Sequence, residues 1–462
     1  MKDFFHSDRL PHLLSGLVFL AGGVFAVVTP PFQVADEPAH FQRAYQLSGG
    51  GLIPVVHSGR TGGFMPSVLA VDTMAFHDIV MKPETRLTLK TFKARLAGAH
   101  DLRAPEPEQF VDFSNTARYS PVVYLPQLPG IWIARLAGLD VFGILYAARI
   151  TALITACVFL FVSLCLLRAV PRLRILFFLL YSSPMSVFVL ASASSDCITI
   201  ALSALVIAIA IRLMACFDPG LFYWGLGAGA ALGLCKQVYF LLPLVLLVPV
   251  LKQGRAGSRR HAAMLFAAAL VPWGIWSLVM GFVYSAPRTD RLVGPWLQLA
   301  HMVAHPLAVL DVFFHDLAVN FYYYKDTFIG RLGWLDVWLS TKIINQYWLL
   351  LLLSVVLALR ADFAKTQGSD RRAWFLTAGN ILFSSSMVYL SAYLSWTPVG
   401  SPVVEGVSGR YFIPVSFLFV ALLPGVLRMN IKIWRFVAAV VILAWARAQW
   451  FSAHSLLDRY WG

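Results

Sequence analysis

Apolar stretches separated by short polar ones make up most of this chain, and most are long enough for a membrane helix. The first runs over residues 11–29, and a hydrophilic stretch follows at 30–120. Residues 121–139 are apolar but rich in proline, so we interpret them as an interfacial segment. The later predicted spans are 145–167, 175–191, 196–214, the broken pair 221–234 and 238–251, 262–284, 347–359, 374–394, 411–427 and 433–450.

This pattern predicts an all-α integral membrane protein with about eleven transmembrane helices. The hydrophilic stretch is too long for a structureless connection, so we expect it to fold as a small cap. The predicted organisation is an N-terminus and first helix (1–29), an external loop with interfacial helices (30–144), transmembrane helices (145–284), a second external region (285–346) and C-terminal transmembrane helices (347–462).

Basic residues cluster in alternate connections between the apolar stretches, whereas acidic and basic residues balance in the first loop. Basic clusters mark the cytoplasmic side of a membrane protein. The N-terminus is therefore predicted to be cytoplasmic in a bacterial inner membrane, with the first loop outside. If residues 121–139 also crossed, the cluster Arg168, Arg172 and Arg174 would lie outside, so we favour one crossing there.

Composition agrees with a membrane protein, since hydrophobic residues make up 59% of the 462 and charged residues only 13%. This excludes a disordered chain and an ordinary soluble enzyme. The net charge of +14 lies in short clusters rather than on one basic face, so a nucleic-acid partner is not predicted. The five cysteines fall in or beside apolar segments, and no disulfide framework is visible.

The densest group of ionisable residues directly follows the first span and comprises Asp36, Glu37, His40 and Arg43. Pro38 favours the start of a helix, which would project His40 and Arg43 from one face. A partly shielded carboxylate at this position could take a proton from an incoming hydroxyl. Helix capping with a surface salt bridge to Arg43 explains the same spacing equally well.

Lys236 interrupts a long apolar region, and a lysine there is costly unless it reaches water or an anion. We predict that Lys236, with the nearby Tyr239, meets a phosphate. A lysine that merely extends to the membrane surface is the alternative.

A further candidate lies in Glu405-Gly-Val-Ser-Gly-Arg410-Tyr411, where glycines flank an acid and an arginine before a span. Arginine can hold a phosphate or carboxylate through two parallel bonds. An interfacial Arg–Tyr anchor is the alternative. Asp336 is a weaker binding candidate in the second external region, and Asp196 is more simply explained as a helix cap.

No metal site is predicted, because His301, His305 and His315 lack ligand-like spacing with acids. Nucleotide-binding and common protease motifs are missing from the sequence as well. No cofactor is therefore predicted, and a requirement for a divalent metal stays open.

Several motifs together resemble a bacterial uncharacterised family of multi-spanning membrane proteins in the GT-C glycosyltransferase superfamily. They are Pro31-Phe-Gln-Val-Ala-Asp36-Glu37-Pro-Ala-His40, Tyr119-Ser-Pro-Val-Val-Tyr124, Ser192-Ala-Ser-Ser-Asp196, Lys236-Gln-Val-Tyr239, Gly330-Arg-Leu-Gly-Trp-Leu-Asp336 and Gly406-Val-Ser-Gly-Arg410-Tyr-Phe-Ile-Pro414.

The resemblance implies a GT-C-like fold and a transferase that uses a polyprenyl-phosphate sugar. Asp36 would be the catalytic base with Glu37 as its close competitor, and Lys236 and Arg410 would hold the lipid phosphate. The further predicted substrate-binding residues are His40, Arg43, Tyr239, Glu405, Tyr411 and Asp336.

The function expected from these observations is transfer of a sugar, with inversion, to a cell-envelope glycan or lipid acceptor at the periplasmic face. The expected partners are the lipid-linked donor, that acceptor and membrane lipid. A transporter or flippase of a lipid-linked sugar is the main alternative, since it would use the same cations without a base. Few charges lie within the predicted spans, which counts mildly against transport. A ligase or polymerase of whole glycans and a scaffold role are further alternatives.

Overall fold

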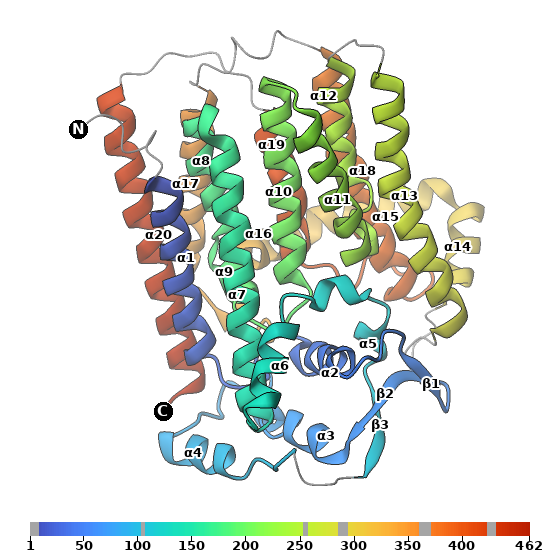
Figure 1. The fold of residues 1–462 in the computed structure, drawn as a ribbon, viewed down its shortest axis with the longest axis vertical. Coiled ribbons are helices and arrows are strands. Elements are labelled where there is room, and N and C mark those ends of the chain that lie inside the picture. Colours follow the sequence, from blue (N-terminus) through green and yellow to red (C-terminus); the bar gives the residue numbers. More distant parts are fainter. Residues whose placement is uncertain (1–8, 103–106, 253–256, 285–293, 360–370, 423–430) are drawn as a thin grey trace.

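The computed structural model describes residues 9–102, 107–252, 257–284, 294–359, 371–422 and 431–462. Most of the helices run side by side as a bundle, and a smaller layer covers one end of it (Figure 1). We call residues 30–140 the cap layer, because they form most of that smaller layer.

The bundle consists mainly of helices after the cap layer, together with the first helix. Its elements are α1 (Arg9–Val28), α7 (Val141–Leu166), η3 (Leu167–Ala169), α8 (Pro171–Tyr181), α9 (Pro184–Leu190), α10 (Asp196–Ala215), α11 (Pro219–Cys235), η4 (Gln237–Tyr239), η5 (Leu242–Leu246), α12 (Leu247–Lys252), α13 (Ser258–Val283), α17 (Thr341–Leu359), α18 (Arg371–Ser395), η7 (Gly409–Phe412), α19 (Ile413–Leu422) and α20 (Ile431–Tyr460).

Helix α10 forms the centre of the bundle. It packs against α7, α11 and α19, and nearly all of its residues are buried. Helix α13, in contrast, exposes large apolar side chains such as Ile275, Leu278 and Phe282. A helix that is apolar all round lies within protein, and one that exposes apolar residues along its length suits contact with lipid. The bundle therefore has the composition of a membrane domain.

Within the described residues, five helices are long and apolar enough to cross a membrane, or up to seven if each of two bent pairs counts as one span. The five are α1, α7 with η3, α10, α13 and α18, and all fall on predicted spans. The region predicted at 175–191 is the bent pair α8–α9, and those at 238–251, 347–359 and 411–427 contain shorter apolar helices. The expected total of about eleven spans is thus not confirmed, because several apolar stretches are broken or short.

The hydrophilic stretch after α1 forms an ordered cap layer. Its elements are α2 (Glu37–Ser48), β1 (Val55–His57), β2 (Arg60–Pro66), α3 (Ser67–Thr73), η1 (His77–Ile79), α4 (Leu89–Ala97), β3 (Glu108–Asp112), α5 (Ser114–Ala117), η2 (Pro121–Tyr124) and α6 (Leu128–Leu136). The strands form an antiparallel sheet in the order β1-β2-β3, with Val55 opposite Gly62 and Gly63 opposite Val111. Helix α2 lies beneath the bundle, beside α5 and α6 (Figure 1).

The region predicted as a second external segment contains α14 (Pro295–Ala304), α15 (Pro306–Val319), α16 (Phe321–Ile329), β4 (Arg331–Leu332) and β5 (Val337–Trp338). Helices α14 and α15 are apolar and bent by 108° relative to each other, as in a broken span or re-entrant loop. We expected this whole segment to lie outside the membrane. The two apolar helices favour instead that part of it enters the membrane.

Parts of several predicted regions lie outside the described residues. They are residues 1–8 of the N-terminus, 103–106 of the external loop, 253–256 and 360–370 between predicted spans, 285–293 of the second external region and 423–427 of the span predicted at 411–427. The position of these parts stays a prediction.

The two ends of the bundle give a direct test of topology. Ser58 lies in the turn between β1 and β2 in the cap layer, and Gly257 directly precedes α13 at the opposite end of the bundle (Figure 1). We expect a reporter inserted at Ser58 to be active outside the inner membrane and one inserted at Gly257 to be active inside. Both reporters on one side would contradict the fold, and the reverse arrangement would contradict the predicted orientation.

Candidate functional site

A buried arginine from α7 holds the turn that follows α1. Arg149 Nη1 donates to the carbonyl oxygens of Ala26 (3.0 Å) and Thr29 (2.9 Å). Its Nη2 donates to the carbonyl oxygen of Pro30 (3.1 Å). The last carbonyls of a helix have no partner within that helix. Arg149 supplies these partners and so fixes the direction in which the chain leaves α1.

Glu37 is the counter-ion of Arg149. Arg149 donates from Nε to Glu37 Oε1 (2.8 Å) and from Nη2 to Oε2 (2.5 Å), and both side chains are fully buried. The backbone N–H of Ala193 also donates to Oε1 (3.0 Å). Both carboxylate oxygens are thus occupied within the protein. Glu37 has the contacts of a structural anchor, which favours Asp36 over Glu37 as the predicted base.

Asp36 differs from its neighbour, since its side chain is partly exposed. Its backbone has a φ of 62°, in the left-handed region that Asp and Asn tolerate better than other side chains with a Cβ. The Asp36 carbonyl accepts the N–H of His40 (3.0 Å), but the carboxylate caps no N–H of α2. Asn115 Nδ2 donates to Asp36 Oδ1 instead (3.1 Å). Helix capping therefore does not explain this carboxylate.

His40 lies one helical turn after Asp36 and is buried between two hydroxyl groups. Its Nδ1 is 3.1 Å from Tyr124 Oη, and its Nε2 is 3.5 Å from Ser195 Oγ. The ring also stacks on Tyr119, with centroids 5.8 Å apart. Burial lowers the pKa of His40 from 6.5 to about 4, although the Asp36 carboxylate partly opposes this shift. A neutral imidazole at pH 7 can accept or pass a proton but supplies no positive charge to a phosphate.

Two cations from separate elements share one buried carboxylate. Lys236 follows the end of α11 and forms an ion pair with Asp196, in the first turn of α10. Arg410 Nε lies 3.9 Å from Asp196 Oδ2. The Lys236 ammonium also lies over the rings of Tyr119 (5.7 Å) and Tyr411 (5.2 Å). The Asp196 side chain thus faces these cations, whereas the sequence favoured its use as a helix cap.

Arg410 is positioned by a close backbone contact between η7 and α16. A Cβ on the preceding Gly409 would lie 2.0 Å from the carbonyl oxygen of Tyr324, so this position requires glycine. The Gly409 N–H donates to Thr327 Oγ1 (2.7 Å). In the same short helix, the carbonyl oxygen of Tyr411 accepts from Tyr239 Oη (2.7 Å). These bonds join η7 to α16 and to η4, which Lys236 directly precedes.

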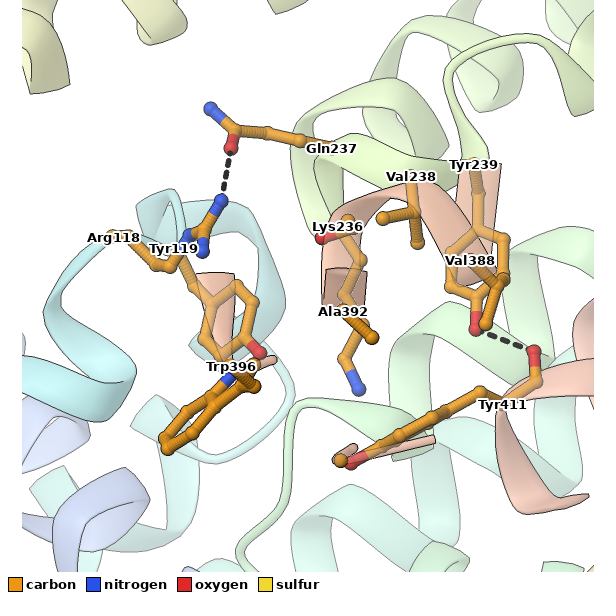
Figure 2. A pocket seen from close by; sticks show the side chains of 12 residues that line it. Arg118, Tyr119, Lys236, Gln237, Val238, Tyr239, Val388, Ala392, Trp396 and Tyr411 are labelled. Atoms are coloured by element: carbon orange, nitrogen blue, oxygen red, sulfur yellow. Dashed lines mark hydrogen bonds between the residues drawn. The ribbon is translucent and has the colours of Figure 1, made fainter. Parts of the chain in front are cut away.

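A small hollow lies beside the Lys236 ammonium. Figure 2 shows the Lys236 side chain pointing between the rings of Tyr119 and Tyr411, with Arg118 and Gln237 at one edge. The hollow has a volume of about 100 Å³. Predicted site residues Lys236, Tyr239 and Tyr411 line it, whereas Arg118 was not predicted.

The charged groups near α2 and those near Lys236 are close enough to act on the same histidine. The charges of Asp36, Asp196, Lys236 and Arg410 all act on the imidazole of His40. We call these five residues the charged cluster. The structure therefore brings together residues from four separate sequence motifs.

Two predicted binding residues have structural partners instead. Arg43 is fully buried and donates to the carbonyl oxygens of Gly51 (2.8 Å) and Leu52 (2.6 Å), and burial lowers its pKa to about 10. Asp336 accepts from Nε (2.9 Å) and Nη2 (2.7 Å) of Arg459 near the end of α20. Each charged group has a partner within the fold, and a binding role for either residue stays a prediction.

The structure places Glu405 beside the site without joining it to the charged cluster. The Glu405 backbone N–H donates to Thr397 Oγ1 (3.0 Å), and the next residue, Gly406, lines the hollow. A binding role for its side chain stays a prediction.

Three residues of this site were missed from sequence. Arg149 gave a usable signal, because a charge within an apolar span requires a buried partner. Arg118 directly precedes the motif that contains Tyr119, but its partner Gln237 lies far away in the chain. Asn115 gave no signal, because only the folded cap layer brings it to Asp36.

No group of three or more His, Cys, Asp or Glu side chains in the described part of the chain could hold a metal ion. His301 and His305 do lie together on α14, with ring centroids 5.1 Å apart. Two imidazoles alone fall short of the ligand sets that bind zinc.

Comparison with known proteins identifies a family. The family described as "Predicted membrane protein (DUF2142)" matches residues 19–419, so the chain belongs to it. No curated protein and no solved structure matches the chain. Membership of this family supports the conclusion that the chain is an integral membrane protein. The family description names no function, so function is inferred from the site.

The Arg149–Glu37 pair is testable by its effect on stability. Arg149→Met or Glu37→Gln alone leaves one buried group without its partner, and we expect each change to destabilise the fold by about 3–5 kcal/mol. The double variant should recover part of this loss. Thermal unfolding in detergent measures the effect, and Arg95→Met, which breaks the more exposed Arg95–Asp78 pair, is a control expected to lose at most about 1 kcal/mol. Equal losses at both sites would contradict the anchoring role.

His40 predicts a specific dependence of stability on pH. Its folded-state pKa lies below 6.5, so the unfolded chain binds the proton first and stability falls as pH decreases from about 6.5 towards 4. Between pH 8 and pH 5 we expect His40 to account for a loss on the order of 2 kcal/mol. Thermal unfolding across this range should show a shallower acid dependence for His40→Gln than for His77→Gln, a change at an exposed histidine. The same acid dependence in both variants would exclude His40 as the cause.

Proposed function

We propose that this member of the DUF2142 family is an inverting, GT-C-type membrane glycosyltransferase that uses a polyprenyl-phosphate sugar as donor. The observation that carries the proposal is the charged cluster, in which a carboxylate without a capping role and two cations meet where the cap layer joins the bundle. A cell-envelope glycan or lipid is the proposed acceptor.

Lys236 and Arg410 are the proposed phosphate-binding groups. When the bond between the anomeric carbon and the phosphate oxygen breaks, the leaving polyprenyl phosphate takes the electron pair and gains negative charge. Cations that are already in position stabilise that charge without reorganising during the reaction. Asp196 holds both cations in place, and because it carries only one negative charge, the trio keeps a net positive charge.

Asp36 is the proposed base. Its carboxylate takes the proton of the acceptor hydroxyl while that oxygen forms the new bond to the anomeric carbon. Attack from the side opposite the leaving phosphate inverts the anomeric centre. His40, one turn away and neutral at pH 7, borders the base without adding a positive charge that would weaken it.

An apolar groove supports a lipid-linked substrate. It has a volume of about 770 Å³ and is lined mainly by apolar side chains of α8 and α16–α19. Gly409 and Phe412 of η7 line this groove, and Tyr411 of the same short helix lines the small hollow. A donor could therefore rest its chain in the groove and its phosphate at Arg410. The proposed location of the reaction is the periplasmic face of the inner membrane.

The direct experiment incubates the purified protein in nanodiscs with a panel of polyprenyl-phosphate sugars and an envelope lipid and glycan extract. Mass analysis then measures the freed polyprenyl phosphate and the sugar gained by the acceptor. A transporter or flippase would move the donor without cleaving it. Donor movement with no cleavage for any sugar would therefore favour transport over transfer.

Asp36→Asn isolates the role of the base. Asn keeps the shape of the side chain and also tolerates the left-handed backbone, so the fold should remain intact. We expect transfer to fall by at least about 100-fold, the lower end of what a positioned base contributes, while donor binding stays near that of the wild type. Asp78→Asn, at a carboxylate paired with Arg95 in the cap layer, is the matched control. Turnover in Asp36→Asn close to that of the control would remove the assignment.

A further inference from the structure

Arg118 brings a cation from the cap layer to the hollow beside Lys236. Its Nη2 donates to Gln237 Oε1 (3.2 Å), and its carbonyl oxygen accepts from Trp276 Nε1 (2.9 Å). Within the described residues no carboxylate forms an ion pair with Arg118. The side chain is therefore held in place by a neutral amide while its charge stays uncompensated.

The charge balance across the hollow is uneven. Lys236 already pairs with Asp196, whereas the side-chain partner of Arg118 is the neutral amide of Gln237. An anion that entered the hollow would meet the unpaired charge of Arg118 together with the N–H groups of its guanidinium. A guanidinium offers parallel donors that match two oxygens of a phosphate group.

The size and walls of the hollow limit what it can hold. Its volume of about 100 Å³ leaves room for one tetrahedral oxyanion. Rings of Tyr119, Tyr239, Trp396 and Tyr411 form much of the remaining wall and reduce contact with water (Figure 2). A partly water-shielded site strengthens the attraction between an anion and a cation.

We propose that this hollow binds a single phosphate group and that Arg118 is a phosphate-binding residue of the cap layer, acting opposite Lys236 of the bundle. The inference rests on the proposed function for the identity of the natural ligand, a lipid-linked phosphate. Binding of the phosphate group itself does not require that any sugar be transferred. A phosphate bound in the hollow would contact Arg118 of the cap layer and Lys236 of the bundle, and so would link these two parts of the protein.

The test titrates the purified full-length protein in detergent with inorganic phosphate and, separately, with farnesyl phosphate. Thermal unfolding is followed, and sodium chloride keeps the ionic strength constant. A ligand that binds only the folded state raises the unfolding temperature, and the stabilisation grows with the logarithm of one plus the ratio of ligand concentration to Kd. We expect both phosphates to stabilise the wild type beyond the sodium chloride reference. Tighter binding of farnesyl phosphate would identify a lipid phosphate as the source, and equal affinity would identify free phosphate.

Arg118→Met removes the charge but keeps an apolar stem against the hollow. The concentration of phosphate needed for a given rise in the unfolding temperature should increase at least about tenfold, as expected for loss of a charge-assisted hydrogen bond. Arg118→Lys should recover part of this loss because it restores the charge without the planar fork. Arg135→Met is the matched control, since Arg135 also lies in the cap layer and bonds a neutral side chain, Ser48 (2.8 Å).

The outcomes separate this inference from the proposed function. No stabilisation of the wild type by either phosphate, or the same titration for Arg118→Met and Arg135→Met, would overturn the inference. Phosphate binding that depends on Arg118 in a protein that cleaves no donor would support the inference and count against the transferase. If Arg118→Met does not fold, an unchanged titration in Arg118→Lys overturns the inference and a weakened one supports it.

Discussion

The site depends on one buried ion pair, Arg149 with Glu37. A guanidinium inside an apolar bundle is tolerated only when its N–H groups are bonded, and here they bond the end of α1, the turn after it and the Glu37 carboxylate. Glu37 in turn accepts the N–H of Ala193, just before α10. A single pair thus fixes α1, α7, the start of α2 and the entry to α10, and these segments carry Asp36, His40 and Asp196.

The same pair explains why two adjacent acids have different roles. Glu37 is directed into the bundle, where every oxygen has a partner. Asp36 is held in a left-handed conformation just before it, so its side chain is directed away from the backbone N–H groups of α2 and towards Asn115. Anchoring one carboxylate therefore frees its neighbour from the capping role that such a residue usually has at the start of a helix.

Sequence alone predicted the elements with strong local signals. Long apolar runs located α1, α7, α10, α13 and α18, and isolated charges beside apolar segments located Lys236 and Arg410. The roles of Glu37 and Asp336 were not predictable, because their partners Arg149 and Arg459 lie far away in the chain. Arg43 instead bonds the carbonyl oxygens of the turn after its own helix, which residue type alone does not show. Apolar composition also could not show which stretches break into short helices. The break between α8 and α9 lies directly before Pro184, a helix-breaking residue that a count of apolar positions does not weigh.

Asp196 keeps Lys236 and Arg410 in position before a substrate binds. Without an internal counter-ion, Lys236 and Arg410 would repel each other and lose their shared orientation in a poorly hydrated place. One carboxylate orders both cations but neutralises only half of their charge, so the remainder stays directed at the incoming group. An arriving phosphate then needs little rearrangement of the protein, and its affinity is not reduced by the entropy of ordering two long side chains. Arg410 belongs to η7, Lys236 directly follows α11, and Asp196 begins α10. Their shared ion pairs therefore also join these three segments beside the cap layer.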